Sequence, residues 1–122
     1  MGLRVSQPMV KLSEYTIDDS DGNPMLKSHA YQAVNDGVVY ANVILITGND
    51  NLDIFVGLTT DPPTDGRLIQ RHSIYTASSN CDVCVTAQVA KGEYFEVRST
   101  TGTVSILWKS QGLALKKPID FN

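Results

Sequence analysis

Turn-forming residues recur along the whole chain at short intervals, and this rhythm limits the fold more than any other feature. Clusters of Gly, Pro, Asn, Asp, Ser and Thr, together with one Lys-Gly pair, lie at 18–24, 35–37, 48–51, 61–66, 78–80, 91–92 and 100–102. The runs between them are rich in Val, Ile, Thr and Tyr, and several alternate apolar with polar residues, as half-buried strands do. No window combines helical spacing of apolar residues with start and stop signals. The pattern therefore predicts an all-β chain.

The strand-like runs fit a single sandwich. We expect strands at 8–14, 27–34, 38–47, 52–59, 67–76, 82–89, 93–98 and 103–109, and the last dozen residues can add a tail strand. About eight strands at this spacing favour an antiparallel β-sandwich, a jelly roll or a small barrel, and a chain of 122 residues is long enough for one domain with a real core. Within that domain we expect an N-terminal arm with the first strand (1–26), a sandwich core (27–112) and a C-terminal tail (113–122).

The stretch KGEYFEVRSTTGTVSILWK at 91–109 contains two alternating runs separated by Ser-Thr-Thr-Gly. In the first run, Phe95 and Val97 share one face, opposite Tyr94, Glu96 and Arg98. The second run places Val104, Ile106 and Trp108 on one face. Two such runs joined by a short turn predict a β-hairpin, with Trp108 in the core.

Two other strands should have one wet face. We expect inward side chains at Leu52, Ile54, Val56 and Leu58, opposite Asp53 and Gly57, and at Val83, Val85, Ala87 and Val89, opposite Cys84, Thr86 and Gln88. The run at 38–46 differs because both of its sides are apolar: Val39, Ala41, Val43 and Leu45 on one, Val38, Tyr40, Ile44 and Ile46 on the other. A second subunit that packs on Tyr40, Ile44 and Ile46 is the simplest way to cover the second apolar side of this strand. The alternative is that the chain's own tail, residues 113–121, folds back over it.

No group of residues indicates catalysis or a resident cofactor. Cys81 and Cys84 form a C-x-x-C without a second ligand pair for zinc, and in a strand they point to opposite faces, so structural, buried or half-buried thiols are favoured. His29 and His72 lie in no nucleophile or metalloprotease motif. The stretch 19–23 lacks the later ligands of a calcium loop and is expected to be a turn. We therefore expect a protein that is not an enzyme and holds no cofactor or metal.

Charge and hydropathy bear on partners. The net charge of −3 and the pI near 5.1 give no electrostatic case for nucleic acid. The longest apolar stretch, VVYANVILI at 38–46, is too short to span a bilayer, and no targeting segment is visible, so synthesis in the cytoplasm is expected.

The longest connection, GLTTDPPTDGR at 57–67, is the expected recognition loop, since loops at the end of a sandwich commonly bind partners. Its adjacent prolines stiffen the backbone, and Asp61, Thr64, Asp65 and Arg67 present hydrogen-bonding groups for a receptor. An exposed connection without a partner is the alternative. A cation held by Asp50, Asp53, Asp61 and Asp65 is a weaker hypothesis.

The segments YQAVNDGVVY, VILITG, NLDIFVGL and VAKGEYFEVRSTTGTVSILWK together resemble the C1q and tumour-necrosis-factor-like jelly rolls, most of all the small trimeric versions on phage tail needles, fibres and other virion appendages. In such domains an Asn-Asp-Gly-like turn precedes a long strand, and a Lys-Gly-acid-aromatic turn leads into a strand that ends near a tryptophan. The resemblance covers about residues 28–112. No heptad or collagen-like stalk segment lies upstream, which departs from the phage-fibre pattern.

The resemblance implies a homotrimer in a virion, in contact with other virion proteins and with a host-surface glycan or protein. We therefore expect a structural protein of a phage tail or capsid appendage that acts by assembly and host attachment. The alternative is a free soluble module that binds a small ligand or glycan through its loops. A tight trimer favours the first hypothesis, and a monomer with loop-dependent affinity favours the second.

Overall fold

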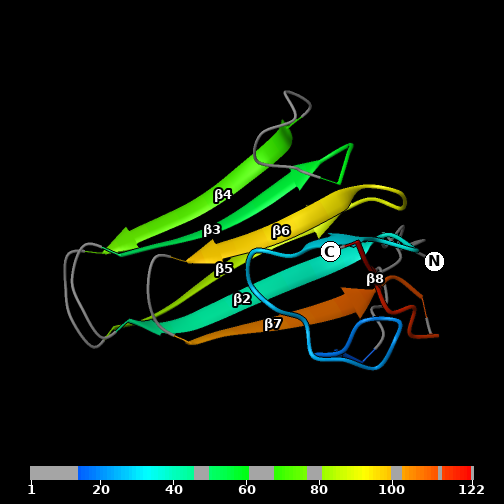
Figure 1. Ribbon diagram of the computed structural model, residues 1–122, viewed down its shortest axis with the longest axis horizontal. Coiled ribbons are helices and arrows are strands. Elements are labelled where there is room, and N and C mark those ends of the chain that lie inside the picture. Colours follow the sequence, from blue (N-terminus) through cyan, green and yellow to red (C-terminus); the bar gives the residue numbers. More distant parts are fainter. Residues whose placement is uncertain are drawn as a thin grey trace, which may run out of the picture.

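The computed structural model describes residues 14–45, 50–60, 68–76, 81–99, 103–112 and 114–121. These residues form two antiparallel sheets and no helix, as the sequence predicts (Figure 1). The strands are β1 (Ala30–Gln32), β2 (Gly37–Leu45), β3 (Asp50–Gly57), β4 (Leu68–Thr76), β5 (Cys81–Val89), β6 (Tyr94–Ser99), β7 (Thr103–Ser110) and β8 (Ile119–Asp120). The expected strand at 8–14 lies almost wholly outside the described residues.

The sheets have different sizes. The five-stranded sheet has the order β4-β3-β6-β1-β8, and the three-stranded sheet has the order β5-β2-β7. Strands that follow each other in sequence therefore alternate between the sheets at most connections, with β3 and β4 as the neighbouring exception. This two-layer antiparallel arrangement is a β-sandwich, and it is compatible with a jelly roll.

The expected hairpin at 91–109 is wrong. The β6 strand pairs with β3 and β1, whereas β7 pairs with β2 in the other sheet. The two strands face each other across the core, where the Phe95 and Trp108 rings stack with centroids 5.4 Å apart and planes 8° from parallel. Period-two alternation marks which side of a strand is buried, and it is the same whether two strands pair edge to edge or pack face to face.

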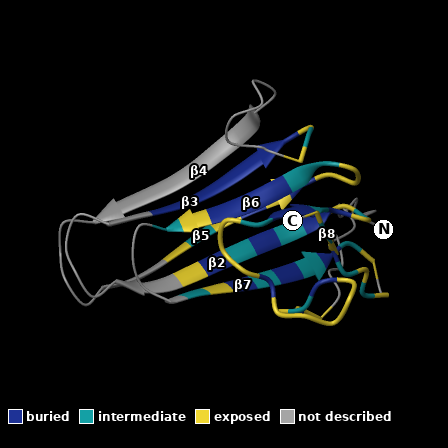
Figure 2. Ribbon diagram, viewed as in Figure 1, coloured by how far each residue is buried: buried dark blue, intermediate teal, exposed yellow. Residues whose placement is uncertain are grey.

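The core lies between the sheets (Figure 2). It contains Leu52, Ile54 and Val56 from β3, with the ring of Phe95 stacked between Tyr31 and Trp108. The remaining buried members of the cluster are Met25, Ala33, Val39, Ala41, Ala87, Val89, Val97 and Ile106. Every described residue that the alternation placed inward on β5, β6 and β7 is in this cluster or packs against it, which confirms the parity of these strands.

The predicted faces of β3 are partly wrong. Leu58 is exposed because β3 ends at Gly57, after a register shift between Val56 and Gly57. Asp53 is buried, so the outer face of β3 is not wet. On β5, Cys84 points outward as predicted, but it is exposed and not a buried structural thiol.

The segment before β1 and the C-terminal tail close one edge of the sandwich. Thr16 exchanges two backbone hydrogen bonds with Trp108, which adds this segment beside β7. The tail returns past the same residue, because the Trp108 Nε1–H donates to the Lys116 carbonyl (2.9 Å), and then pairs as β8 with β1. In its described part the tail therefore bridges the edges of the two sheets and does not cover the outer face of β2.

Two glycines in the motifs quoted above, Gly37 and Gly92, are required for different structural reasons. Gly92 has φ +87° in the turn before β6, a conformation that favours glycine. Gly37 is instead required by a close approach, since a Cβ there would lie 2.3 Å from the Lys109 carbonyl oxygen and 2.6 Å from the Trp108 ring. Gly37 is not among the glycines with positive φ, so close packing and not a turn conformation requires a glycine there.

Candidate functional site

The outer face of the three-stranded sheet carries a continuous apolar row. Tyr40 of β2 is in register with Leu107 of β7 on one side and with Thr86 of β5 on the other. Tyr40 and Leu107 are half-buried on this outer face. The apolar row therefore joins β7 to the central strand β2 and ends at the polar Thr86 on β5.

The segment before β1 extends this row beyond β7. Thr16 pairs with Trp108 and is buried like it, so its neighbours Tyr15 and Ile17 face outward on the same side as Leu107. Tyr15 is 59% exposed and Ile17 is 48% exposed. We call the surface formed by Tyr15, Ile17, Val38, Tyr40 and Leu107 the apolar stripe.

One cation lies in the apolar stripe. The Lys109 Nζ lies 5.8 Å from the centre of the Tyr40 ring and 6.0 Å from the centre of the Tyr15 ring. An ammonium over aromatic faces is attracted by their negative π surface, typically by about 0.5–1 kcal/mol each at exposed sites. Lys109 therefore connects the segment before β1 to the centre of the sheet, and its charge is shielded by two rings.

The border of the apolar stripe on β2, β5 and β7 is polar but uncharged. The described outward residues there are Asn42, Cys84, Thr86, Gln88 and Ser105. Lys109 is the only charged side chain among the described outward residues of these three strands. Interface cores are depleted in charged residues in the same way, so this face has the composition of a protein contact surface.

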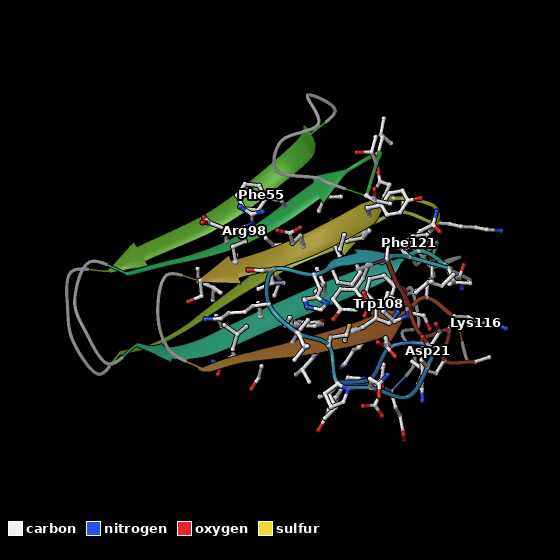
Figure 3. All side chains as sticks on the ribbon, viewed as in Figure 1. Asp21, Phe55, Arg98, Trp108, Lys116 and Phe121 are labelled. Carbon is white, nitrogen blue, oxygen red and sulfur yellow. The ribbon has the colours of Figure 1, made fainter. Side chains whose placement is uncertain are left out.

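The outer face of the five-stranded sheet has a different character. Asp53, Phe55 and Glu96 are all buried there, and Arg98 forms an ion pair with Glu96 through its Nε. In the register, Asp53 is opposite Arg98 and Phe55 is opposite Glu96 (Figure 3 labels Phe55 and Arg98). The carboxylates of Asp53 and Glu96 therefore lie among side chains of their own sheet, and their role in this part of the face is structural.

The residues predicted as functional are only partly described. Tyr40 lies in the apolar stripe, at the centre of the face that was expected to be covered. Ile44 belongs to β2, but its side chain lies outside the described residues, as does all of Ile46. The expected receptor loop, with Asp61, Thr64, Asp65 and Arg67, also lies outside them.

Two neighbours of Tyr40 in the stripe could not be predicted from the sequence. Tyr15 and Ile17 join the stripe only because Thr16 pairs with Trp108, a contact between distant parts of the chain. Local alternation carries no signal of that pairing.

The Asp-rich stretch at 19–23 is a turn, as predicted. The Asp19 carboxylate is buried, and its Oδ1 accepts hydrogen bonds from the backbone N–H groups of Asp21 (2.9 Å) and Asn23 (3.1 Å). Gly22 has φ +83° in the same turn. In the part of the chain that is described, no three His, Cys, Asp or Glu side chains are grouped closely enough to hold a metal ion.

A buried tyrosine fastens the start of β1. The hydroxyl of Tyr31 accepts a hydrogen bond from the Leu26 N–H (2.6 Å), and burial raises the pKa of Tyr31 to about 12. The Leu26 hydrogen bond acts against this shift, while the charges of Asp120 and Asp19 add to it. The His29 ring lies beside Tyr31, and its Nδ1 is 3.7 Å from the Asp120 carboxylate of β8.

No family model, curated protein or solved structure matches the chain. Within the described residues there is no helix long and apolar enough to cross a membrane.

Proposed function

We propose that this protein is a non-enzymatic structural protein of a phage tail or capsid appendage, which assembles as a homotrimer of jelly-roll sandwiches. The observation that carries the proposal is the apolar stripe, which joins Ile17, Leu107 and Tyr40 on a face where Lys109 is the one charged side chain among the described outward residues of β2, β5 and β7. Contiguous exposed apolar surface is uncommon on monomeric proteins and is typical of interaction sites. A second copy would cover this surface.

The trimer and the virion are supported by the resemblance of residues 28–112 to the C1q and tumour-necrosis-factor-like jelly rolls. In this proposal other virion proteins hold the trimer in place after its synthesis in the host cytoplasm. Attachment to a host glycan or protein through Asp61, Thr64, Asp65 and Arg67 belongs to the same proposal.

The mass of the native protein tests the assembly directly. Light scattering over a dilution series down to nanomolar concentrations should give a constant trimer mass. A Thr86→Arg variant should shift the mass toward the monomer, because it places a charge beside Tyr40 on an exposed side chain that the fold does not require. Thr60→Arg, an identical change at an exposed residue after β3, is the matched control and should remain trimeric.

The exposed thiol of Cys84 gives a second readout on the same face. In a Cys81→Ser background, Cys84 of the assembled protein should react more slowly with a maleimide than Cys84 of the dissociated Thr86→Arg variant. A wild-type protein that is monomeric at all concentrations would contradict the proposal.

A free ligand-binding module is the second candidate, and one observation favours it. Phe121 is exposed, and its ring meets Tyr94 edge-on with centroids 5.4 Å apart. Exposed aromatic rings are common stacking surfaces for sugars. Binding of a monomeric protein in a glycan screen, lost on Phe121→Ala, would place this function first.

A further inference from the structure

Two segments of the chain lie beside each other at the closed edge of the sandwich. These are the N-terminal segment (residues 14–26) and the tail segment (residues 114–121). The backbone N–H of Ser20 donates to the Pro118 carbonyl (2.7 Å), and both segments bond to Trp108. Figure 3 shows Asp21, Lys116 and Phe121 at this same end of the molecule.

Both segments expose apolar side chains. Tyr15, Ile17 and Leu26 are exposed on the N-terminal segment, and Ile119 and Phe121 are exposed on the tail segment. Elsewhere in the described part of the chain, the only exposed large hydrophobic residues are Val34 and Leu58. The exposed apolar surface is therefore concentrated on these two segments, and Tyr15 and Ile17 are also part of the apolar stripe.

The two segments carry opposite charge. The N-terminal segment contains Glu14, Asp18, Asp19 and Asp21 and no basic residue, whereas the tail segment contains Lys116, Lys117 and one acid, Asp120, whose carboxylate lies 3.7 Å from the His29 Nδ1 of the same chain. The side chains of Asp21 and Lys116 are both exposed. Neither forms an ion pair with another described residue, so within one copy the segments are joined by backbone atoms while these charges face outward.

This distribution selects one kind of contact between copies. A contact between the N-terminal segments of two copies would bring acids together, and a contact between their tail segments would bring lysines together. Both contacts are electrostatically unfavourable. Segment against tail pairs opposite charges and apolar surface at once. We propose that the N-terminal segment of one copy docks against the tail segment of a second copy. This inference rests on the proposed assembly, and a contact between two different surfaces is what a closed ring of three requires.

Charge reversal in two separate chains tests the contact. Asp21→Lys makes the N-terminal segment less acidic, so that it attracts the basic tail segment of a second copy of the same variant less strongly. Lys116→Glu makes the tail segment less basic, so that it attracts the acidic N-terminal segment of a second copy less strongly. Each variant alone should need a several-fold higher protein concentration to assemble than the wild type. An equimolar mixture should assemble at lower concentration than either variant alone, and native mass spectrometry should show mixed complexes.

The mixture separates a contact between copies from an effect inside one chain, because mixing does not change either fold. Lys91→Glu changes the net charge as Lys116→Glu does, at an exposed turn residue that belongs to neither segment, and should assemble like the wild type. If the wild type assembles and the mixture is no tighter than its components, this contact is wrong while the proposed function stands. If the wild type itself stays monomeric, the proposed function fails first.

Discussion

Position 37 must be a glycine because its neighbours leave no room for even one additional carbon atom. It begins β2 directly against the Trp108 ring and the Lys109 backbone, with no room for a Cβ. Gly37→Ala should therefore lower the free energy of unfolding by about 1–3 kcal/mol, the usual cost of overpacking a core. Urea titration measures this difference.

Gly92→Ala is the matched comparison for Gly37→Ala. Nothing lies within 4 Å of a Cβ at Gly92, so only its positive φ is strained. The cost should be about 1 kcal/mol, as expected for a non-glycine residue in the left-handed region. Equal losses in the two variants would show that the approach to Trp108 is not the reason for Gly37.

Tyr31 should make stability depend on alkaline pH. Its pKa is raised to about 12 in the folded protein, chiefly by burial, from about 10 in an unfolded chain. Its contribution is thus complete below pH 10 and is lost as pH rises toward 12, up to roughly 2–3 kcal/mol. Unfolding titrations between pH 8 and 11.5 should show a steeper loss for the wild type than for Tyr31→Phe. Parallel curves would mean that Tyr31 ionises freely in the fold.

Single residues also show where sequence reasoning succeeds. Alternation correctly placed Phe95, Val97 and Trp108 inward, because strand parity is a local property. It could not predict the burial of Asp53, which depends on Arg98 and other neighbours of its sheet, or the exposure of Cys84, which depends on what lies beyond the sheet.

Among the elements, the tail depends on one buried hydroxyl. The Ser110 Oγ accepts a hydrogen bond from the Lys116 N–H (3.0 Å) and donates to the Ala114 carbonyl (3.2 Å), at the end of β7. Ser110→Ala removes both bonds and should cost about 1–3 kcal/mol. Hydrogen exchange should become faster for amides of the tail and β8 than for those of β2. Unchanged exchange in the tail would show that its other contacts, with Trp108, Ser20 and β1, hold it without the Ser110 hydroxyl.

Strand pairing is the element-scale feature that sequence reasoning predicted least well. The positions of β2 to β7 agree with the expected runs to within a few residues, since turn residues and β-rich runs are local signals. The partner of each strand is not local. The short connection after β6 is compatible with a hairpin and with a crossing to the other sheet, and the stacking of Phe95 on Trp108 accompanies the crossing.

For the whole molecule, the central question is what covers the apolar stripe. The sequence indicated this surface through Tyr40, because β2 is apolar on both sides. Its full extent depends on three segments that meet only in the folded chain, namely β2, β7 and the segment around Thr16. The dilution series tests whether a second copy covers the apolar stripe. The mixing experiment tests whether the N-terminal segment of one copy contacts the tail segment of another.

The pairing of Thr16 with Trp108, and of Ser20 with Pro118, also has a consequence for synthesis. Thr16 and Ser20 are synthesised well before Trp108 and Pro118, so the closed edge cannot form until the chain has been extended past residue 118. Long-range contacts of this kind form late in folding. Tyr15 and Ile17 therefore reach their places beside Leu107 only after residue 108 has left the ribosome. In the proposed assembly, shorter nascent chains on neighbouring ribosomes would lack the finished contact surface, and this would keep them from joining prematurely.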